Sequence, residues 1–485
     1  MLPGLSRMTL SPTVGATGAY RKSLLWLVAV GFFMQTLDAT IINTALPAMA
    51  ASLGESPLRM QSVIVSYALT MAMLIPSSGW VADRFGARRV FFSAIVLFVA
   101  GSIACAASHG LGQLVAARVL QGAGGALLLP VGRLALLRTV PRHEFVQAMS
   151  FVAIPGLIGP LLGPTLGGWL VQYASWHWIF LINVPVGLAG GVATLRIMPE
   201  LRSPMLQRFD GVGYALLAFG MVTVSLALDG VSGIGAGRAG VLVLMVFGFA
   251  SLVGYWLHAS RRPDPLFSPD MLRIPTFSIG LLGNLFSRLG SGCMPFLVPL
   301  LLQVSMGYSP LHAGLTMLPI AMAGMAMKRA AAPLITRYGY RRVLVVNTVM
   351  VGGSMATFGL ATPGQPLALL VAQLVAFGAF NSLQFTAMNT VTLRDLAPDM
   401  ASGGNSLFSM VQMLAMSLGV AAAGTVLGGF RDVFGRATSA ATLHTFQATF
   451  VSMGLMTIAS ALIFWHLPLD ARAVQPAQPE VSGHG

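Results

Sequence analysis

Charged residues are scarce in this chain. Asp, Glu, Lys and Arg make up only 9% of its 485 residues, whereas a soluble domain carries roughly a quarter. Hydrophobic residues reach 55% of the composition, and the mean hydropathy is +0.78. Because so few charges cannot cover the surface of a soluble protein of this length, the composition predicts a membrane protein.

Cysteine and lysine are nearly absent as well. Cys105 and Cys293 both fall in apolar segments, which excludes a disulfide framework and a CxxC metal site. The only lysines are Lys22 and Lys328, and no phosphate-binding Gly-Lys-Ser/Thr loop exists, which excludes ATP-driven transport by this chain. No HExxH pattern occurs, which argues against a zinc hydrolase. We therefore expect no catalytic residue, no metal and no cofactor.

Apolar runs of about 20 residues recur along the chain, separated by short polar loops. A run of this length crosses a bilayer as a helix, because a backbone in lipid must satisfy its own hydrogen bonds. We predict an all-α polytopic membrane protein. Its fourteen spans are predicted at approximately 24–46, 62–82, 90–108, 111–132, 146–171, 177–198, 212–229, 239–258, 276–303, 311–332, 343–361, 366–390, 404–429 and 446–467.

The net charge of +14 raises the alternative of a nucleic-acid partner. The positions of the charges argue against it. With alternate loops and both termini taken as one side, that side holds 22 of the 28 Lys and Arg residues. Such a bias is typical of cytoplasmic loops. We therefore expect cytoplasmic N- and C-termini, a surrounding lipid bilayer and no nucleic-acid partner.

One carboxylate lies deep in a predicted span. Asp38 is about 21 Å from the start of the first span at 1.5 Å per residue, while the other acidic residues lie in loops or near span ends. An intramembrane carboxylate is costly and by default marks a functional site. A structural Asp that is hydrogen-bonded to neighbouring helices is the alternative. We assign Asp38 to proton coupling, which requires a titratable group.

The fourth span carries Arg118, several residues from its predicted external end. The side chain could snorkel outward to water. However, Gly122, Gly124 and Gly125 beside it favour close helix approach. An Arg118 that pairs with and detaches from Asp38 would change the protonation of that carboxylate between states, so we add it to the proton-coupling site.

The stretch 79–90 joins the second and third spans through a short charged turn. Asp83 opens the turn, and three arginines follow it closely. We expect the carboxylate to make charge-assisted hydrogen bonds with these guanidiniums and so to hold the helix ends together. An ordinary positive-inside loop explains the arginines, but it does not explain the carboxylate or the glycines. The predicted conformational switch consists of Gly79, Asp83, Arg84, Gly86, Arg88 and Arg89.

The fifth span is the densest in glycine and proline. Gly159, Gly163 and Gly167 recur every four residues, which places them on one helix face and lets another backbone approach. Pro160 and Pro164 remove backbone donors and bend the helix. A merely kinked helix is the alternative. The predicted hinge consists of Gly156, Gly159, Pro160, Gly163, Pro164, Gly167 and Gly168.

Two motifs return at an offset of 253 residues. The sequence at 54–58 returns at 307–311, and the turn at 83–90 returns at 336–343. An internal repeat of this kind is typical of transporters. It predicts an N-terminal segment at 1–23, a six-helix bundle at 24–198, linkers with two inserted helices at 199–275, a second six-helix bundle at 276–467 and a disordered cytoplasmic tail at 468–485.

The repeated halves differ in charge. Asp83 becomes Thr336, and Asp38 aligns with Ser291. The second half contributes Arg288 in mid-span, which should face the bundle interior or a wet cavity. Lys328 and Arg329 are better explained as snorkelling anchors. The predicted substrate cavity is lined by Gln35, Thr40, Asn43 and Arg288.

Four of these features together resemble the major facilitator superfamily. The turn at 79–90 is similar to its signature loop, which locks and unlocks two halves of a transporter. The span around Arg118 matches its fourth-helix signature, and the run at 155–168 resembles the antiporter signature of drug:proton exchangers. With fourteen spans, the chain resembles the fourteen-span drug:proton antiporter branch. The resemblance implies two six-helix bundles, a central cavity, alternating access and export driven by proton influx.

The predicted function is a proton-coupled efflux transporter of small molecules, drugs or toxic amphiphiles, in the bacterial inner membrane. We expect it to act as a monomer on a small-molecule substrate and protons, without a cofactor. Export of a small organic anion or its metal chelate is the alternative, since the deep charges are two positive and one negative. A membrane enzyme, a scaffold or sensor, and a channel fit the sequence less well.

Overall fold

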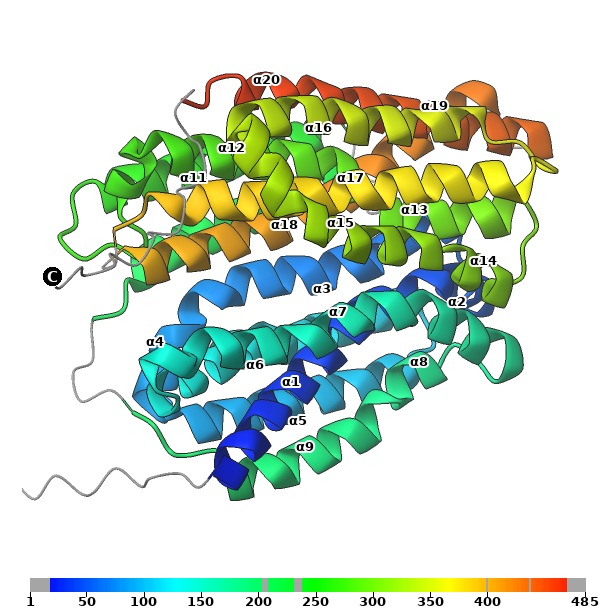
Figure 1. The fold of residues 1–485 in the computed structure, drawn as a ribbon. Helices are drawn as coiled ribbons and strands as arrows, with labels where there is room; N and C mark the ends of the chain where they lie inside the picture. The colour runs from blue at the N-terminus through cyan, green and yellow to red at the C-terminus, as the bar shows by residue number, and fades with distance from the viewer. Residues whose placement is uncertain (1–17, 203–207, 231–237, 398–399, 436–437, 469–485) are drawn as a thin grey trace, which may run out of the picture.

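The structure is a computed structural model that describes residues 18–202, 208–230, 238–397, 400–435 and 438–468. Within these ranges it contains no strand, and fourteen helical segments are long and apolar enough to cross a membrane. The predicted all-α fold with fourteen spans is therefore confirmed (Figure 1). Most of the predicted N-terminal segment and nearly all of the predicted tail, residues 1–17 and 469–485, lie outside the described residues.

The first half of the chain forms the first six spans. Its first helix begins at Gly18, before the predicted start at Leu24, and it is followed by a 3₁₀ segment and a short helix. The elements of this half are α1 (Gly18–Ile41), η1 (Ile42–Thr44), α2 (Leu46–Ser52), η2 (Pro57–Met60), α3 (Gln61–Leu74), η3 (Ile75–Ser77), α4 (Ser78–Phe85), α5 (Ala87–Ala106), α6 (Leu111–Thr139), α7 (Arg142–Tyr173), α8 (Trp178–Leu181) and α9 (Asn183–Ile197).

Two inserted helices and the second half follow. The inserted pair is α10 (Gly211–Gly230) and α11 (Arg238–Ala259). The elements of the second half are η4 (Pro269–Arg273), α12 (Pro275–Ser291), α13 (Met294–Leu300), the π-helical η5 (Leu301–Ser305), α14 (Pro310–Thr316), α15 (Leu318–Tyr338), α16 (Tyr340–Ala356), η6 (Thr357–Leu360), α17 (Leu367–Arg394), α18 (Ala401–Phe434), α19 (Ser439–Ala459) and α20 (Ala461–Phe464).

The backbone repeats at the same offset as the sequence. Gly54 and Gly307 have φ values of 66° and 71°, and Gly86 and Gly339 have φ values of 95° and 78°. Only glycine adopts this region of φ at little cost. The paired glycines therefore mark equivalent turns of the two halves, one pair at each end of the helices.

The two halves share a hydrophobic core at the end that carries Gly54 and Gly307. This core combines buried residues of both halves, such as Ile42 with Met294 and Leu297. Gln303 of η5 also donates a hydrogen bond of 3.0 Å to the backbone oxygen of Thr44. At the end that carries Gly86 and Gly339, each half has a hydrophobic cluster of its own. The halves are thus joined most extensively at the first end, where α2 and α14 lie in Figure 1.

The two inserted helices, α10 and α11, pack on the outside of the two halves. α10 packs against α3 of the first half and α18 of the second, through a cluster that includes Leu69, Met221 and Met410. Thr425 of α18 donates a hydrogen bond of 2.6 Å to the backbone oxygen of Leu228 in α10. α11 packs mainly on α10, and only 11% of the residues in its apolar stretch are buried. α10 therefore bridges the halves, while α11 faces the lipid.

Candidate functional site

A buried ion pair lies inside the first half. The guanidinium of Arg118 in α6 donates from Nη1 to Oδ2 of Asp38 in α1 at 2.7 Å, and each side chain is only 1% exposed. The structure thus brings together the two residues assigned to proton coupling and turns Arg118 inward rather than outward to water. Taking two charges out of water costs free energy, which this geometry offsets only if further hydrogen bonds satisfy both groups.

The remaining bonds of Arg118 come from α3 and α6. Nε donates to the backbone oxygen of Val63 at 3.3 Å, and Nη1 also donates to Oε1 of Gln121 at 2.7 Å. The guanidinium lies 4.1 Å from the ring centre of Tyr67, within range of a cation–π interaction. Arg118 therefore has neighbours that would hold it if its bond to Asp38 were lost.

The carboxylate of Asp38 is held from two further helices. Oδ1 accepts hydrogen bonds from the amides of Gln121, at 2.7 Å, and Asn183 of α9, at 3.0 Å. Gln121 also donates to the hydroxyl of Ser102 in α5 at 2.8 Å. Four helices, α1, α5, α6 and α9, therefore meet in one polar network within an apolar bundle.

Four residues of this site were not predicted from the sequence: Gln121, Asn183, Ser102 and Tyr67. A signal was present for two of them. Gln121 lies one turn beyond Arg118 and so shares a face with it, and Asn183 is a polar residue within an apolar run. Ser102 and Tyr67 are ordinary residues for a membrane helix, and nothing in the sequence shows that they face the ion pair.

The charged turn is shorter than predicted. Helix α4 continues to Phe85 and α5 begins at Ala87, so Gly86 is the only residue between them. Arg84 lies near the rings of Trp80 and Phe85 within the same helix end, and Arg89 is exposed. The three predicted partners of Asp83 are therefore spread over the ends of two helices rather than gathered in a loop.

Asp83 pairs with an arginine outside the predicted switch. Its carboxylate accepts a hydrogen bond from Arg138 at the end of α6, and both side chains are about one-third exposed. The prediction that Asp83 bonds Arg84, Arg88 or Arg89 was wrong. Asp83 lies in the last turn of α4, where side chains point back along the helix and so away from the start of α5. Because α4 packs against α6, Arg138 is the guanidinium within its reach.

The other switch residues contact the linker that follows α9. Arg88 donates to the backbone oxygen of Met198 at 2.5 Å, and the N–H of Ala87 donates to the backbone oxygen of Leu201 at 3.0 Å. A Cβ atom on Gly86 would lie 1.6 Å from a carboxylate oxygen of Glu200. Among the described residues, the ion pair and these contacts all lie within the first half and its linker.

Gly79 does not lie in the turn. It is an exposed residue of α4, and a Cβ atom there would meet nothing within 4 Å. The prediction that it marks one end of the turn was wrong, because the second span remains helical to Phe85.

The glycine face of α7 packs against the backbone of α1. A Cβ atom on Gly159 would lie 2.8 Å from the backbone nitrogen of Leu37, and one on Gly167 would lie 2.3 Å from the backbone oxygen of Ile41. Gly163 and Gly156 face Thr40 and Phe32 of the same helix. The predicted close approach of backbones is therefore present, and it holds the helix that carries Asp38.

The end of this glycine run contacts the second half. A Cβ atom on Gly168 would lie 2.2 Å from the backbone oxygen of Pro310, and one on Gly314 would lie 2.2 Å from that of Pro164. Thr165 also donates to the backbone oxygen of Gly314 at 3.4 Å. α7 continues through Pro155, Pro160 and Pro164 without interruption. One helix thus joins the Asp38 helix to the second half.

The residues assigned to a substrate cavity come from both halves: Gln35, Thr40 and Asn43 lie on α1 and η1, and Arg288 lies on α12. Thr40 bonds the backbone of its own helix and of Gly159, and Asn43 bonds the backbone oxygen of Thr40. Gln35 is buried, and its amide oxygen has no partner among the described residues. The structure therefore turns Thr40 toward α7.

Arg288 differs from Arg118 in its partners. Its Nε donates to Oδ1 of Asn284 at 2.8 Å, and its guanidinium lies 4.8 Å from the ring centre of Phe385. No carboxylate pairs with it among the described residues. The amide nitrogen of Asn284 and the hydroxyl of Ser287 are buried beside it, and neither has a hydrogen-bond partner in the part of the chain that the structure describes. The predicted anchors Lys328 and Arg329 are exposed.

Comparison with known proteins gives a family and relatives. The sequence pattern of the Major Facilitator Superfamily matches residues 28–420. The chain is 53% identical over 446 residues to "Putative multidrug resistance protein MdtD" of Serratia proteamaculans (strain 568), with 92% of this chain and 93% of that protein covered. A protein of the same name from Yersinia enterocolitica (serotype O:8 / biotype 1B) is 49% identical over 449 residues, with 93% and 96% covered.

Solved structures with the same fold are more distant. A POT family transporter in complex with 5-aminolevulinic acid has a TM-score of 0.66 at 15% identity, with 91% of this chain and 94% of that chain covered. A D-xylose-proton symporter has a TM-score of 0.66 at 15% identity, with 92% and 98% covered. At this identity the likeness concerns the fold alone.

Proposed function

Because this chain belongs to the Major Facilitator Superfamily, we propose that it exports drugs or toxic amphiphiles in exchange for protons, by alternating access. It is a transporter rather than an enzyme, and a multi-pass protein of the bacterial inner membrane. The substrate class follows the names of its relatives, which call them multidrug resistance proteins. The partners would be a small-molecule substrate and protons, with no cofactor and with a monomer as the working unit.

The ion pair of Asp38 and Arg118 carries the proposal. Protonation of Asp38 from the outside would remove its charge and release Arg118 to the other groups around it, Gln121, Tyr67 and the Val63 carbonyl. Deprotonation on the inside would restore the pair. Because Asp38 lies on the helix that packs against α7, a change at the carboxylate would reach the contact between the halves.

The described conformation fits one stage of this cycle. The halves are joined most extensively at the Gly54 and Gly307 end, which the distribution of positive charge assigns to the outside. The switch residues at the other end bond within the first half. We infer that the conformation opens to the cytoplasm, where substrate would enter while the switch is disengaged from the second half.

The test measures proton movement in inverted membrane vesicles. The vesicles are energised, and then cations, neutral compounds and organic anions are added in turn to wild type and to Asp38→Asn. Proton release from the lumen is expected with one class of compound in wild type and is expected to be absent in the variant. Full proton-coupled transport by Asp38→Asn would contradict the proposal.

A small organic anion or its metal chelate is the second candidate substrate. Arg288 supports it, because within the described part of the chain its charge has no carboxylate partner and two polar side chains without hydrogen-bond partners lie beside it. Arg288 is half-buried, and a cation that is partly withdrawn from water without a charged partner is favoured by an anionic ligand. Arg288→Gln should then abolish the proton release caused by anionic compounds and leave the proton release caused by cations and neutral compounds unchanged. An unchanged response to anions in this variant would leave the drug assignment as the better one.

A further inference from the structure

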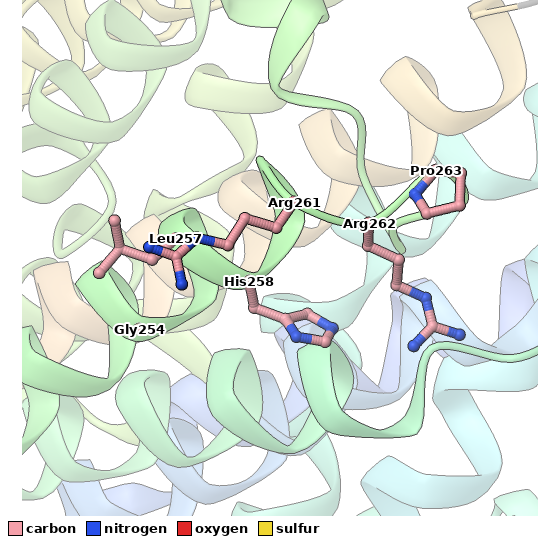
Figure 2. A pocket seen from close by; sticks show the side chains of 6 residues that line it. All are labelled: Gly254, Leu257, His258, Arg261, Arg262 and Pro263. Carbon is pink, nitrogen blue, oxygen red and sulfur yellow. The ribbon is translucent and has the colours of Figure 1, made fainter.

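A hollow lies at the end of α11, the helix that faces the lipid. It has a volume of about 500 Å³ and is lined by Gly254, Leu257, His258, Arg261, Arg262 and Pro263 (Figure 2). We propose that this hollow binds the headgroup phosphate of an anionic phospholipid whose acyl chains lie along α11. The site is separate from the ion pair of Asp38 and does not depend on the proposed transport function.

Two of the three basic side chains in the hollow already have a partner. Asp210, which precedes α10 and is buried, accepts a hydrogen bond of 2.8 Å from His258 and lies 3.4 Å from Arg262. Its carboxylate also accepts hydrogen bonds from the backbone of Gly213 and Leu266. Burial acts to raise the pKa of Asp210, but these hydrogen bonds outweigh it and hold the pKa below its ordinary value. Asp210 therefore stays ionised and offsets the charge around Arg262.

Arg261 is the basic residue of the hollow whose charge Asp210 does not offset. It is exposed, and no carboxylate pairs with it among the described residues. Figure 2 shows its side chain turned back along α11 toward Leu257, while His258 and Arg262 point the other way. The nearest acidic residue along the chain, Asp264, is exposed, and its backbone oxygen accepts a bond from Arg262. A guanidinium placed in this way is suited to the oxygen atoms of a phosphate.

The apolar part of a lipid would fit the face of α11 above the hollow. Val246, Val253 and Leu257 are 66%, 57% and 50% exposed, and their four-residue spacing places Val253 and Leu257 on one face of α11. Arg261 follows the end of α11, and its side chain turns back toward Leu257 (Figure 2). Trp256 on the same turn is 47% exposed, and Trp is enriched at the boundary between lipid and water. The acyl chains would therefore lie on this face and bring the headgroup to Arg261.

The hollow lies on the side of the membrane where anionic headgroups are expected. The ring of Phe209, next to Asp210, lies 4.8 Å from the ring of Trp80 in α4, which places this end beside the Gly86 turn. The distribution of positive charge assigns that side to the cytoplasm. The cytoplasmic leaflet carries a negative surface potential that attracts basic residues near the membrane. Charge complementarity thus favours an anionic lipid over a zwitterionic one.

The test is native mass spectrometry of the intact protein with an equimolar mixture of phosphatidylglycerol and phosphatidylcholine. Wild type should retain one phosphatidylglycerol in preference to phosphatidylcholine. Arg261→Gln should lower that preference roughly fivefold, from the effect of one basic residue near the surface. Gly254→Leu should lower it by filling the hollow; a Cβ atom at this position would meet only Leu216, at 3.6 Å, so the backbone can accept the change.

The matched control is Arg273→Gln in the same linker. Arg273 is 85% exposed, pairs with Asp270 and does not line the hollow. Its replacement removes one positive charge outside the hollow and should leave the preference for phosphatidylglycerol unchanged. Equal losses from Arg261→Gln and Arg273→Gln would overturn the proposal, as would equal retention of the two lipids by wild type. Displacement of the lipid by millimolar inorganic phosphate would also overturn it, in favour of a free-anion site.

Discussion

The two halves of this protein have similar backbones but different buried charges. Turns with positive φ recur at Gly54 and Gly307 and at Gly86 and Gly339. In the first half, Asp38 and Arg118 form a buried ion pair. In the second half, the position of Asp38 is taken by Ser291, whose hydroxyl bonds its own helix. The comparison indicates that the repeat serves the fold, whereas the buried ion pair of the proposed proton-coupling site occurs only in the first half of the described residues.

The polar groups of the second half are organised without a carboxylate. Asn347 donates to Gln384 at 2.8 Å, and Gln384 donates to Thr348 at 2.6 Å. These groups are neutral, so the network has no member whose charge changes with protonation near neutral pH. Arg288 is the charged exception. Within the described residues, the second half therefore has no counterpart of Asp38.

The largest expected effect is on the stability of the first half. Arg118→Gln leaves the buried carboxylate of Asp38 without its cation, which should cost about 3–5 kcal/mol of unfolding free energy. Arg288→Gln should cost much less, because no ion pair is broken. The measurement is thermal unfolding in detergent. Adding Asp38→Asn to Arg118→Gln should recover most of the loss; a double variant as unstable as the single one would contradict this account.

The second effect concerns close glycine contacts in α7 and in α18, which are the fifth spans of the first and second halves. Gly167→Ala would place a methyl group 2.3 Å from the backbone oxygen of Ile41, and should cost about 1–3 kcal/mol. Gly419→Ala in α18 would place one 2.9 Å from the backbone oxygens of Arg288 and Leu289 in α12, and should cost less. Gly79→Ala is the control and should be neutral or slightly stabilising. Equal unfolding midpoints for all three variants would show that the backbone contacts are not limiting.

The third effect compares the two positive-φ turns. Gly86→Ala and Gly339→Ala both force a side chain into a left-handed conformation, which costs about 1–2 kcal/mol. Gly86→Ala should cost more, because the added methyl group also meets Glu200, whereas nothing lies within 4 Å at Gly339. Thermal unfolding of both variants measures the difference. A larger loss from Gly339→Ala would refute this account of the linker contact.

The smallest effect is expected at the surface ion pair of the switch. Asp83→Asn removes the partner of Arg138, and since both side chains are about one-third exposed, stability should fall by no more than about 1 kcal/mol. The loss should shrink as salt is added. Thr336→Val at the equivalent position should have no such salt dependence, because the Thr336 hydroxyl bonds only its own helix. A salt-independent loss from Asp83→Asn would argue against a role for its charge.

Several features of the site were predicted from the sequence because they depend on neighbours along the chain. Asp38 and Arg118 stand out as charges within apolar runs, and the repeat of glycines in α7 predicts a close helix contact. The prediction of the bonding partner of Asp83 was wrong, and Asn183 was not predicted to belong to the site of Asp38. Each of these depends on which helix faces which, a property that the spacing within one helix does not contain.

The sequence by itself determined that the chain spans the membrane fourteen times and repeats its two halves. Hydrophobic runs and matching motifs are properties of the linear chain, and each span satisfies its own backbone hydrogen bonds. Only the tertiary structure decided that Arg118 turns inward to Asp38, that Asp83 meets Arg138, and that α10 bridges the two halves. These outcomes follow from the rotation and packing of whole helices, because partners more than fifty residues apart meet only after the bundle has formed.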